Sequence, residues 1–446
     1  MMAQATTMEE ASDLALSEGR KKGCDDISVL CSRSNESQVR FANNEITLVN
    51  NVRNLTLVLY ITKNRKRILG ATYNPTARGI ESFVSKLVKS CESLPQSEDY
   101  VPLPGGPFKY NKHANFDPKV EDASLVEYVK QTIDEGLRSG AKRVSGSLNT
   151  ETSEISVLTS AGVSGKDKET QILLNVRAFA EDNSSGQGLS CSSYVSDFHP
   201  ASAGRKAGEE AKKSLNPKQL SDGIYDVIFS STVVANILPI ASSASAFAIE
   251  SGSSFLAEKL DQKIAVEALT IEDYGVFPRG LGGRVFDDEG TPTQTNKIIS
   301  EGRFVLMLQN CTTAKKFGKK STGNAGIIGP RPTTIVFRNG AQALEEIIRD
   351  TKQGVLITNN WYTRYQNMRT GEYSTVPRDA AFRIEAGEIK EAVAGLRVSD
   401  SIPRQLNNIE SISKERDWIR WWEVDTPTLA PAMKIKGVRI TEAVGS

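Results

Sequence analysis

The sequence has few of the residues that build metal sites. Its 446 residues include two histidines, His113 and His199, and neither has a second His or Cys three or four positions away. Zinc sites usually take two ligands spaced about one helical turn apart, so that both side chains reach one ion. A catalytic zinc site built from this chain alone is therefore excluded, and we expect each loop histidine to bond solvent or backbone.

Cysteine is also scarce, and its pattern does not suggest disulfides. The five cysteines are an odd number at wide spacings, and no two of them form a C-x-x-C pair: Cys24, Cys31, Cys91, Cys191 and Cys311. Such spacing is unlike a disulfide framework. We predict reduced and mostly buried thiols.

Long apolar runs and an excess of charge are absent as well. No stretch of about 18 apolar residues occurs, and the first residues lack the basic start and apolar run of a signal peptide. Lys and Arg number 55 against 54 Asp and Glu, a net charge of +1 that supplies no field toward nucleic acid or anionic lipid. We expect a cytoplasmic protein without a membrane segment and without a nucleic-acid partner.

Common catalytic motifs are missing from the sequence. There is no G-x-S-x-G elbow, and F-G-K-K-S-T-G at 317–323 lacks the glycine lead of a P-loop. Four lysines around this stretch favour a solvated face, with an anion or acidic-peptide contact as the alternative: Lys315, Lys316, Lys319 and Lys320. A metal-independent site that joins His199 to Cys191 or to a serine stays open, because such partners can be distant in sequence.

The length and the hydrophobic periodicity predict two domains in an α+β fold. The first 95 residues read as a helix, antiparallel strands (27–31, 37–41, 45–49 and 54–61) and a second helix with apolar residues from Ile80 to Cys91. The same order returns about 115–125 positions later and closes with a helix at 201–215. This predicts an N-terminal domain, 1–221, made of duplicated helix and antiparallel-sheet units at about 5–95 and 120–216.

From residue 222 the pattern changes to many short strands with glycine-rich loops. We predict a C-terminal, β-rich and barrel-like domain with helices over 222–446. A helix is expected at 232–249 with a break at Pro239, and two more near 341–350 and 403–412.

Four polar stretches of this second part contain glycine: 252–255, 280–293, 321–325 and 370–374. Glycine permits close backbone approach, and neighbouring hydroxyl and amide side chains can bind an extended peptide. Tight turns between strands are the alternative interpretation. The candidate peptide-binding residues are Ser253, Ser254, Thr322, Gly323, Asn324, Tyr373 and Ser374.

These stretches resemble the TldD/PmbA family, once called modulators of DNA gyrase, and within it the TldE (PmbA) type of subunit. The matching residues are G-S-S-F-L-A-E-K-L-D-Q-K-I-A (252–265), F-D-D-E-G-T-P-T-Q (286–294), A-K-K-F-G-K-K-S-T-G-N-A (314–325) and G-E-Y-S near 371. The resemblance implies a two-subunit peptidase whose TldD-like chain holds zinc through an H-E-x-x-x-H helix and a cysteine near its C-terminus. The corresponding stretch here, N-I-L-P-I-A-S-S-A-S (236–245), has no such ligand, and 413–430 contains no cysteine.

The resemblance therefore implies a non-catalytic TldE-like subunit without catalytic residues, metal ligands or cofactor of its own. Zinc is expected in a TldD-like partner subunit. When the chain is alone, a homodimer is the alternative assembly. The expected substrate is an unfolded or extended peptide. We assign Trp418, Trp421 and Trp422 to the subunit interface, since clustered tryptophans beside an arginine are typical of buried contacts. The alternatives are a thiol or serine peptidase using Cys191, Cys311 or His199, and a protein acting on gyrase or DNA.

Overall fold

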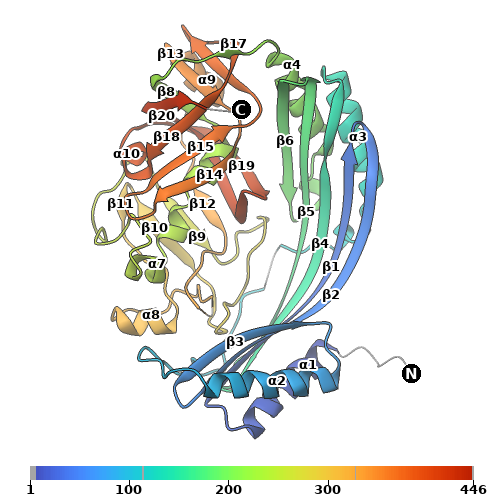
Figure 1. The fold of residues 1–446 in the computed structure, drawn as a ribbon, viewed down its shortest axis with the longest axis vertical. Coiled ribbons are helices and arrows are strands. Elements are labelled where there is room, and N and C mark those ends of the chain that lie inside the picture. The colour runs from blue at the N-terminus through green and yellow to red at the C-terminus, as the bar shows by residue number, and fades with distance from the viewer. Residues whose placement is uncertain (1–6, 113–114, 327, 444–446) are drawn as a thin grey trace.

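A computed structural model of the chain describes residues 7–112, 115–326 and 328–443. Two β-sheets lie side by side, with helices on the outer face of the first sheet and interspersed among the strands of the second (Figure 1). This confirms the predicted α+β class. Over the described ranges, none of the helices combines the length and the apolar character needed to cross a bilayer.

The first sheet consists of two units with the same order of elements. The first unit is α1 (Met8–Lys21), β1 (Asp26–Ala42), β2 (Glu45–Lys63), β3 (Lys66–Tyr73) and α2 (Ala77–Glu92). After the short η1 (Pro118–Val120), the second unit is α3 (Leu125–Arg138), β4 (Arg143–Thr159), β5 (Ser164–Glu181), β6 (Ser184–Ser192), η2 (Val195–Asp197) and α4 (Pro200–Lys213). The strands pair antiparallel in the order β3-β2-β1-β4-β5-β6, so the two units meet at β1 and β4. The predicted duplication is thus present as one continuous sheet.

Helices cover the two ends of one face of this sheet. At one end, α1 and α2 bury Ala15 and Val84 against Leu57 and Leu59 of β2. At the other end, α3 and α4 pack on β4 and β5 in a separate core. Thr7 is the N-cap of the first helix. Its hydroxyl accepts from the Glu10 N–H, and the Glu10 carboxylate accepts from the Thr7 N–H.

The second sheet is mixed, and its strands and short helices come from residues 218–442. Its strands are β7 (Lys218–Gln219), β8 (Gly223–Phe229), β9 (Ile271–Tyr274), β10 (Thr295–Ser300), β11 (Arg303–Phe304), β12 (Ile335–Phe337), β13 (Gln353–Ile357), β14 (Asn360–Asn367), β15 (Glu372–Pro377), β16 (Ala381–Glu385), β17 (Glu388–Ala394), β18 (Leu396–Ser401), β19 (Ile409–Trp421) and β20 (Val424–Glu442). Its helices are α5 (Ser231–Ile237), α6 (Ile240–Ser243), α7 (Ala246–Glu250), α8 (Cys311–Lys316), α9 (Leu344–Arg349) and α10 (Ile402–Asn407). The long strand β20 pairs with β8, β12, β18 and β19 and so holds this part together.

Two helix predictions for this part need correction. The helix expected at 232–249 has the predicted break at Pro239, between α5 and α6, and a second, unpredicted one before α7, where Ser245 forms a β-bridge with Leu308. The helix expected at 403–412 ends at Asn407, and Ile409 and Ile412 begin β19, where they pair with Ile435 and Met433.

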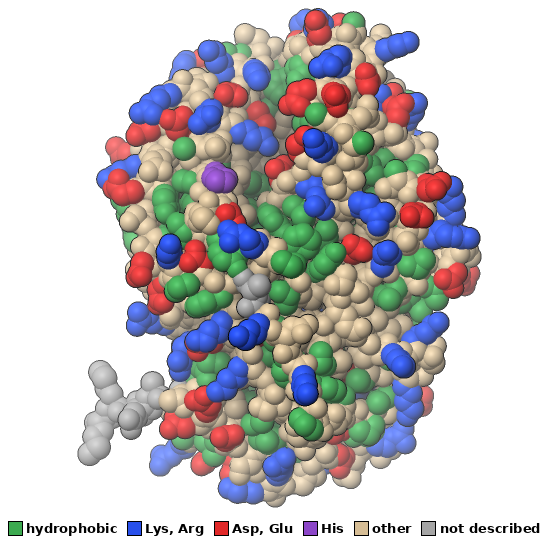
Figure 2. Space-filling model, turned by 180° about the vertical axis from the view of Figure 1, so that it is seen from behind, with side chains coloured by type: hydrophobic (Ala, Val, Ile, Leu, Met, Phe, Trp, Pro, Cys, Tyr) green, Lys and Arg blue, Asp and Glu red, His purple; other side chains and the backbone are tan. Residues whose placement is uncertain are grey.

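The surface carries both signs of charge. Figure 2 shows Lys and Arg interspersed with Asp and Glu over the face seen from behind. This agrees with the net charge of +1. No broad region of one sign dominates that face.

Candidate functional site

Several of the candidate peptide-binding residues hold the fold with their own hydroxyls. Ser254 is 1% exposed and donates to the Ser243 carbonyl at 2.7 Å. Tyr373 is fully buried and donates to Gln405 Oε1 at 2.9 Å, and the neighbouring Ser374 accepts from an arginine. Ser253 is exposed beside the hydroxyl of Ser251. None of these four residues lines the cavity beside Asn324 that is described below.

Thr322, Gly323 and Asn324 belong to a second group, which packs against the 286–294 loop. Gly323 has φ +70°, and a Cβ there would lie 2.4 Å from the Pro292 carbonyl oxygen, so only glycine fits this approach. The Thr322 hydroxyl accepts from the Gln309 N–H at 2.8 Å. The close approach of Gly323 to Pro292 joins two of the family-like stretches.

A cavity of about 310 Å³ opens beside this junction. Its walls include Glu169 of β5, residues 282–284, Phe286, Asp287, Asn324, residues 331–333, Arg420 of β19 and the start of β20. The cavity therefore lies between the first sheet and the second. Asn324 is the member of the predicted set that lines it, and its amide donates to Asp273 Oδ2 at 2.6 Å.

Three consecutive acidic residues, Asp287, Asp288 and Glu289, are buried in the loop behind this cavity. Asp287 Oδ1 accepts from the Thr291 N–H at 2.9 Å, and its Oδ2 accepts from the Ala325 N–H at 2.9 Å. Burial, reinforced by the charge of Glu289, raises the pKa of Asp287 to about 8 despite these amide donors. The Asp287 carboxylate therefore holds the 286–294 loop in place through its hydrogen bonds to these two N–H groups.

Arginines line the same cavity. Arg284 Nη1 donates to Asp288 Oδ1 at 2.7 Å, and Arg331 Nη2 contacts both oxygens of Asp288 at 3.2 Å. Arg420 reaches across to Gln171 of the first sheet. The glycines of 280–293 mark this stretch in the sequence, but no sequence motif distinguishes Arg284, which directly follows Gly282 and Gly283.

The two thiols of the metal-independent alternative are covered by the fold, and its histidine is exposed. Burial raises the pKa of Cys191 to about 11, and its sulfur contacts the Arg420 carbonyl oxygen at 3.4 Å. Burial and the Glu289 carboxylate raise the pKa of Cys311 far above its usual range. His199 is exposed at the N-cap of α4. A thiolate nucleophile is disfavoured at both cysteines.

The stretch corresponding to a zinc-binding helix does not fit zinc. Asn236 is 7% exposed, and its amide donates to the Glu423 carbonyl at 3.0 Å while its Oδ1 accepts from Asn360 at 2.7 Å. The remaining residues to Ser245 are apolar or carry hydroxyls, which are poor zinc ligands beside thiolate, imidazole and carboxylate. Among the described residues, no three His, Cys, Asp or Glu side chains are grouped to hold a metal ion.

The three tryptophans differ in their surroundings. Trp421 is 7% exposed and belongs to the core, and Trp418 packs edge-on against Phe277 with ring centroids 5.6 Å apart. Trp422 is 52% exposed and meets Tyr362 edge-on at 6.3 Å. Of the three, Trp422 offers the most ring surface to a partner.

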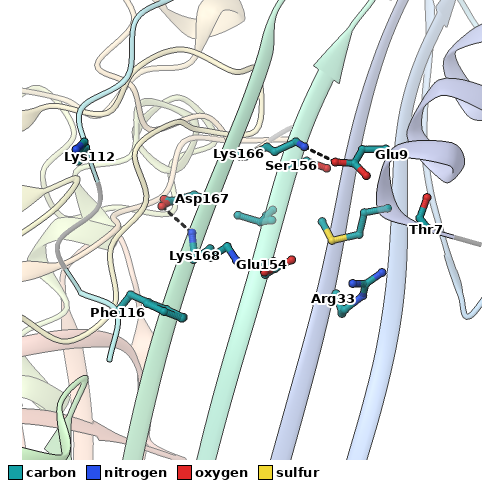
Figure 3. A pocket seen from close by; sticks show the side chains of 12 residues that line it. Thr7, Glu9, Arg33, Lys112, Phe116, Glu154, Ser156, Lys166, Asp167 and Lys168 are labelled. Carbon is teal, nitrogen blue, oxygen red and sulfur yellow. Dashed lines mark hydrogen bonds and ion pairs between the residues drawn. The ribbon is translucent and has the colours of Figure 1, made fainter. Parts of the chain in front are cut away.

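A second, larger cavity of about 480 Å³ lies between α1 and the strands β1, β4 and β5 (Figure 3). Its charges are largely matched within the chain, since Lys166 pairs with Glu9 and Lys168 with Glu154. Asp167 accepts from the Val285 N–H at 2.8 Å. None of the candidate residues lines this cavity. We therefore take the smaller cavity, where the family-like stretches meet, as the candidate site.

Comparison with known proteins agrees with the resemblance. Residues 115–215 match the PmbA/TldA metallopeptidase central domain, and residues 222–442 match the PmbA/TldA metallopeptidase C-terminal domain. A metalloprotease PmbA homolog of Buchnera aphidicola subsp. Acyrthosiphon pisum (strain APS) is 31% identical over 264 residues, 58% of this chain and 57% of that protein. Metalloprotease PmbA of Escherichia coli O157:H7 is 29% identical over 245 residues, 53% of this chain and 51% of that protein. The chain spans about half the length of the curated relatives it matches.

The fold is shared with a solved structure. TldE from Thermococcus kodakarensis superposes with a TM-score of 0.86 over 97% of this chain and 100% of that one, at 21% identity. At that identity the likeness establishes the fold.

Proposed function

The chain belongs to the PmbA/TldD metallopeptidase family, and from this premise we propose that it is a TldE-type subunit that binds extended peptides for cleavage by a partner. The partner is a TldD-like chain that carries the zinc. This chain contributes positioning, since holding a substrate in reactive geometry supplies a large part of a rate enhancement.

The observation that carries the proposal is the chemistry around Asn236. A metallopeptidase needs a Lewis acid and a water of lowered pKa, and both depend on metal ligands. In this chain the corresponding stretch holds an amide bonded to Glu423 and Asn360. Division of labour between two subunits accounts for a family member with this substitution.

The cavity between the two sheets supports the binding role. It is lined by residues of the stretches that carry the family resemblance, among them Phe286, Asp287 and Asn324. At about 310 Å³ it is at the lower end of the range of ligand pockets, enough for one or two residues of a peptide.

The test is to purify the chain alone, the TldD-like partner alone, and both together. We expect zinc-dependent cleavage of an unfolded peptide by the mixture, and neither cleavage nor stoichiometric zinc for this chain alone. Size-exclusion chromatography with light scattering reports whether a heterodimer forms and whether the lone chain is a homodimer. Zinc-dependent cleavage by the lone chain would overturn the proposal.

The same samples separate the alternatives. A thiol peptidase would resist chelators and lose its activity on alkylation, contrary to what the raised pKa values of Cys191 and Cys311 lead us to expect. A protein acting on DNA would bind it with a steep salt dependence. The mixed surface charge in Figure 2 and the net charge of +1 argue against such binding.

A further inference from the structure

One side of a buried guanidinium in the candidate site has no partner. Arg284 Nη1 is bonded to Asp288, but its Nε and Nη2 are buried and meet no hydrogen-bond acceptor among the described residues. Buried donors left without an acceptor are unfavourable, and folded proteins rarely leave two adjacent ones. This edge of Arg284 therefore requires an explanation.

The unpartnered edge has the geometry that carboxylates bind. Nε and Nη2 of a guanidinium point the same way and can donate two parallel hydrogen bonds to the two oxygens of one carboxylate. Arg284 lines the cavity, and its side chain is 22% exposed. Nε and Nη2 are themselves covered, so a carboxylate binds them once the side chains over that edge move aside. Gly283, the residue before it, lines the same cavity without a side chain to obstruct it.

The cavity is lined by three acidic residues, Glu169, Asp287 and Asp425, and by two further arginines that can donate to an anion. Asp288, the partner of Arg284, is shared with Arg331, so one carboxylate faces two guanidinium groups. Arg420 lines the opposite wall, where Gln171 accepts from it. Both are further donors for the oxygens of a bound anion.

We propose that this cavity binds a carboxylate of the peptide substrate through the Nε and Nη2 edge of Arg284. The identity of the ligand as a peptide rests on the function proposed above, and the binding of a carboxylate rests on the cavity itself. The carboxylate comes either from the C-terminus of the peptide or from an Asp or Glu side chain, since both present the same two oxygens.

The experiment measures binding by fluorescence anisotropy with N-terminally labelled hexapeptides, using the full chain alone and with its partner. Three peptides share one neutral sequence: one ends in a free acid, one in an amide, and one in an amide with an internal Glu. We expect the free-acid or the Glu peptide to bind roughly tenfold more tightly than the neutral amide. Which of the two does so identifies the source of the carboxylate.

The variant Arg284→Lys keeps the charge and loses the paired donors. It should reduce the preference for an acid to less than about twofold, with an unchanged melting temperature as the check on folding. Arg416→Lys is the matched control, since Arg416 is a partly buried arginine of β19 that donates to the Phe337 carbonyl and does not line the cavity. This control should retain the full preference.

Equal affinity for all three peptides would overturn the carboxylate inference and leave the peptide-binding function standing. An acid preference that survives Arg284→Lys would equally overturn it. Failure of every peptide to bind would refute the inference, whereas the proposed function is judged separately by cleavage in the mixture of both subunits.

Discussion

Arg177 of β5 and Asp379, between β15 and β16, connect the two sheets through an ion pair whose loss should destabilise the chain measurably. The Asp379 side chain is fully buried and that of Arg177 is 25% exposed. Arg177 Nε donates to Asp379 Oδ1 at 2.8 Å, and the Ser185 hydroxyl donates to the same oxygen at 2.6 Å. The substitution Arg177→Met keeps a long side chain and leaves the carboxylate with neutral donors alone.

The expected cost follows from burial. Removing one partner of a buried ion pair costs about 3–5 kcal/mol, and the remaining donors place this case near the lower value, about 3 kcal/mol. An unfolding entropy of about 2.1 cal/mol/K per residue gives about 0.9 kcal/mol/K for 446 residues, so the melting temperature should fall by about 3 °C if the chain unfolds as one unit.

The sheet provides a matched control in Arg143. Arg143 and Arg177 both stack on the ring of Phe179, at 4.5 and 4.8 Å, but Arg143 pairs with Asp182, which is fully exposed. Arg143→Met therefore loses the same stacking without stranding a buried charge, and should lower the melting temperature by less than about 1 °C. Scanning calorimetry of both variants measures the difference. Equal losses would refute the reasoning, because they would assign the effect to stacking.

Two further predictions concern α4 and the strand beside it. Burial raises the pKa of Glu210 to about 7, so the folded state holds a proton that the unfolded state releases near 4.5, and this stabilisation is lost as the pH rises through 7. Melting temperatures between pH 5 and 8 should therefore depend less on pH in Glu210→Gln than in the wild type, while the exposed-site variant Glu209→Gln keeps the wild-type slope. A Cβ on Gly188 would lie 2.0 Å from the Ala203 carbonyl oxygen, so Gly188→Ala should cost about 1–3 kcal/mol in urea unfolding. Gly105→Ala, where no atom lies within 4 Å, should be near neutral, and similar midpoints for the two would contradict the close approach of strand and helix.

Much of the first sheet could be predicted because its helices have one apolar side. Ile80, Val84 and Leu87 recur at helical spacing, and all three are buried in α2. The lengths of β1 and β2 could not be predicted in this way. Residues 33–38 of β1 are all polar, so they show no alternation of apolar and polar positions. They are nevertheless paired with β2 and β4 through the backbone. A strand held in this way gives no hydrophobic signal.

The prediction of a helix at 403–412 was wrong for a different reason. Ile402, Leu406 and Ile409 are spaced as on a helix, and the first two are indeed buried in α10. Ile409 is also buried, but by pairing with Ile435 in β20. Short apolar runs fit either structure, and the long partner strand decides between them.

The candidate site could be predicted only in part, because the sequence does not show what packs against the polar face of β5. Leu174, Val176 and Ala178 alternate with Asn175 and Arg177, a pattern normally interpreted as one buried and one solvated face. The polar face instead meets the second sheet, with Gln171 bonded to Arg420 and Arg177 to Asp379. Polar side chains satisfy this alternation equally well against water or against complementary polar groups. The sequence indicates Gly282 and Gly283 as part of a glycine-bearing stretch, and both line the cavity. That Arg284 has two nitrogens without an acceptor can be seen only in the folded structure.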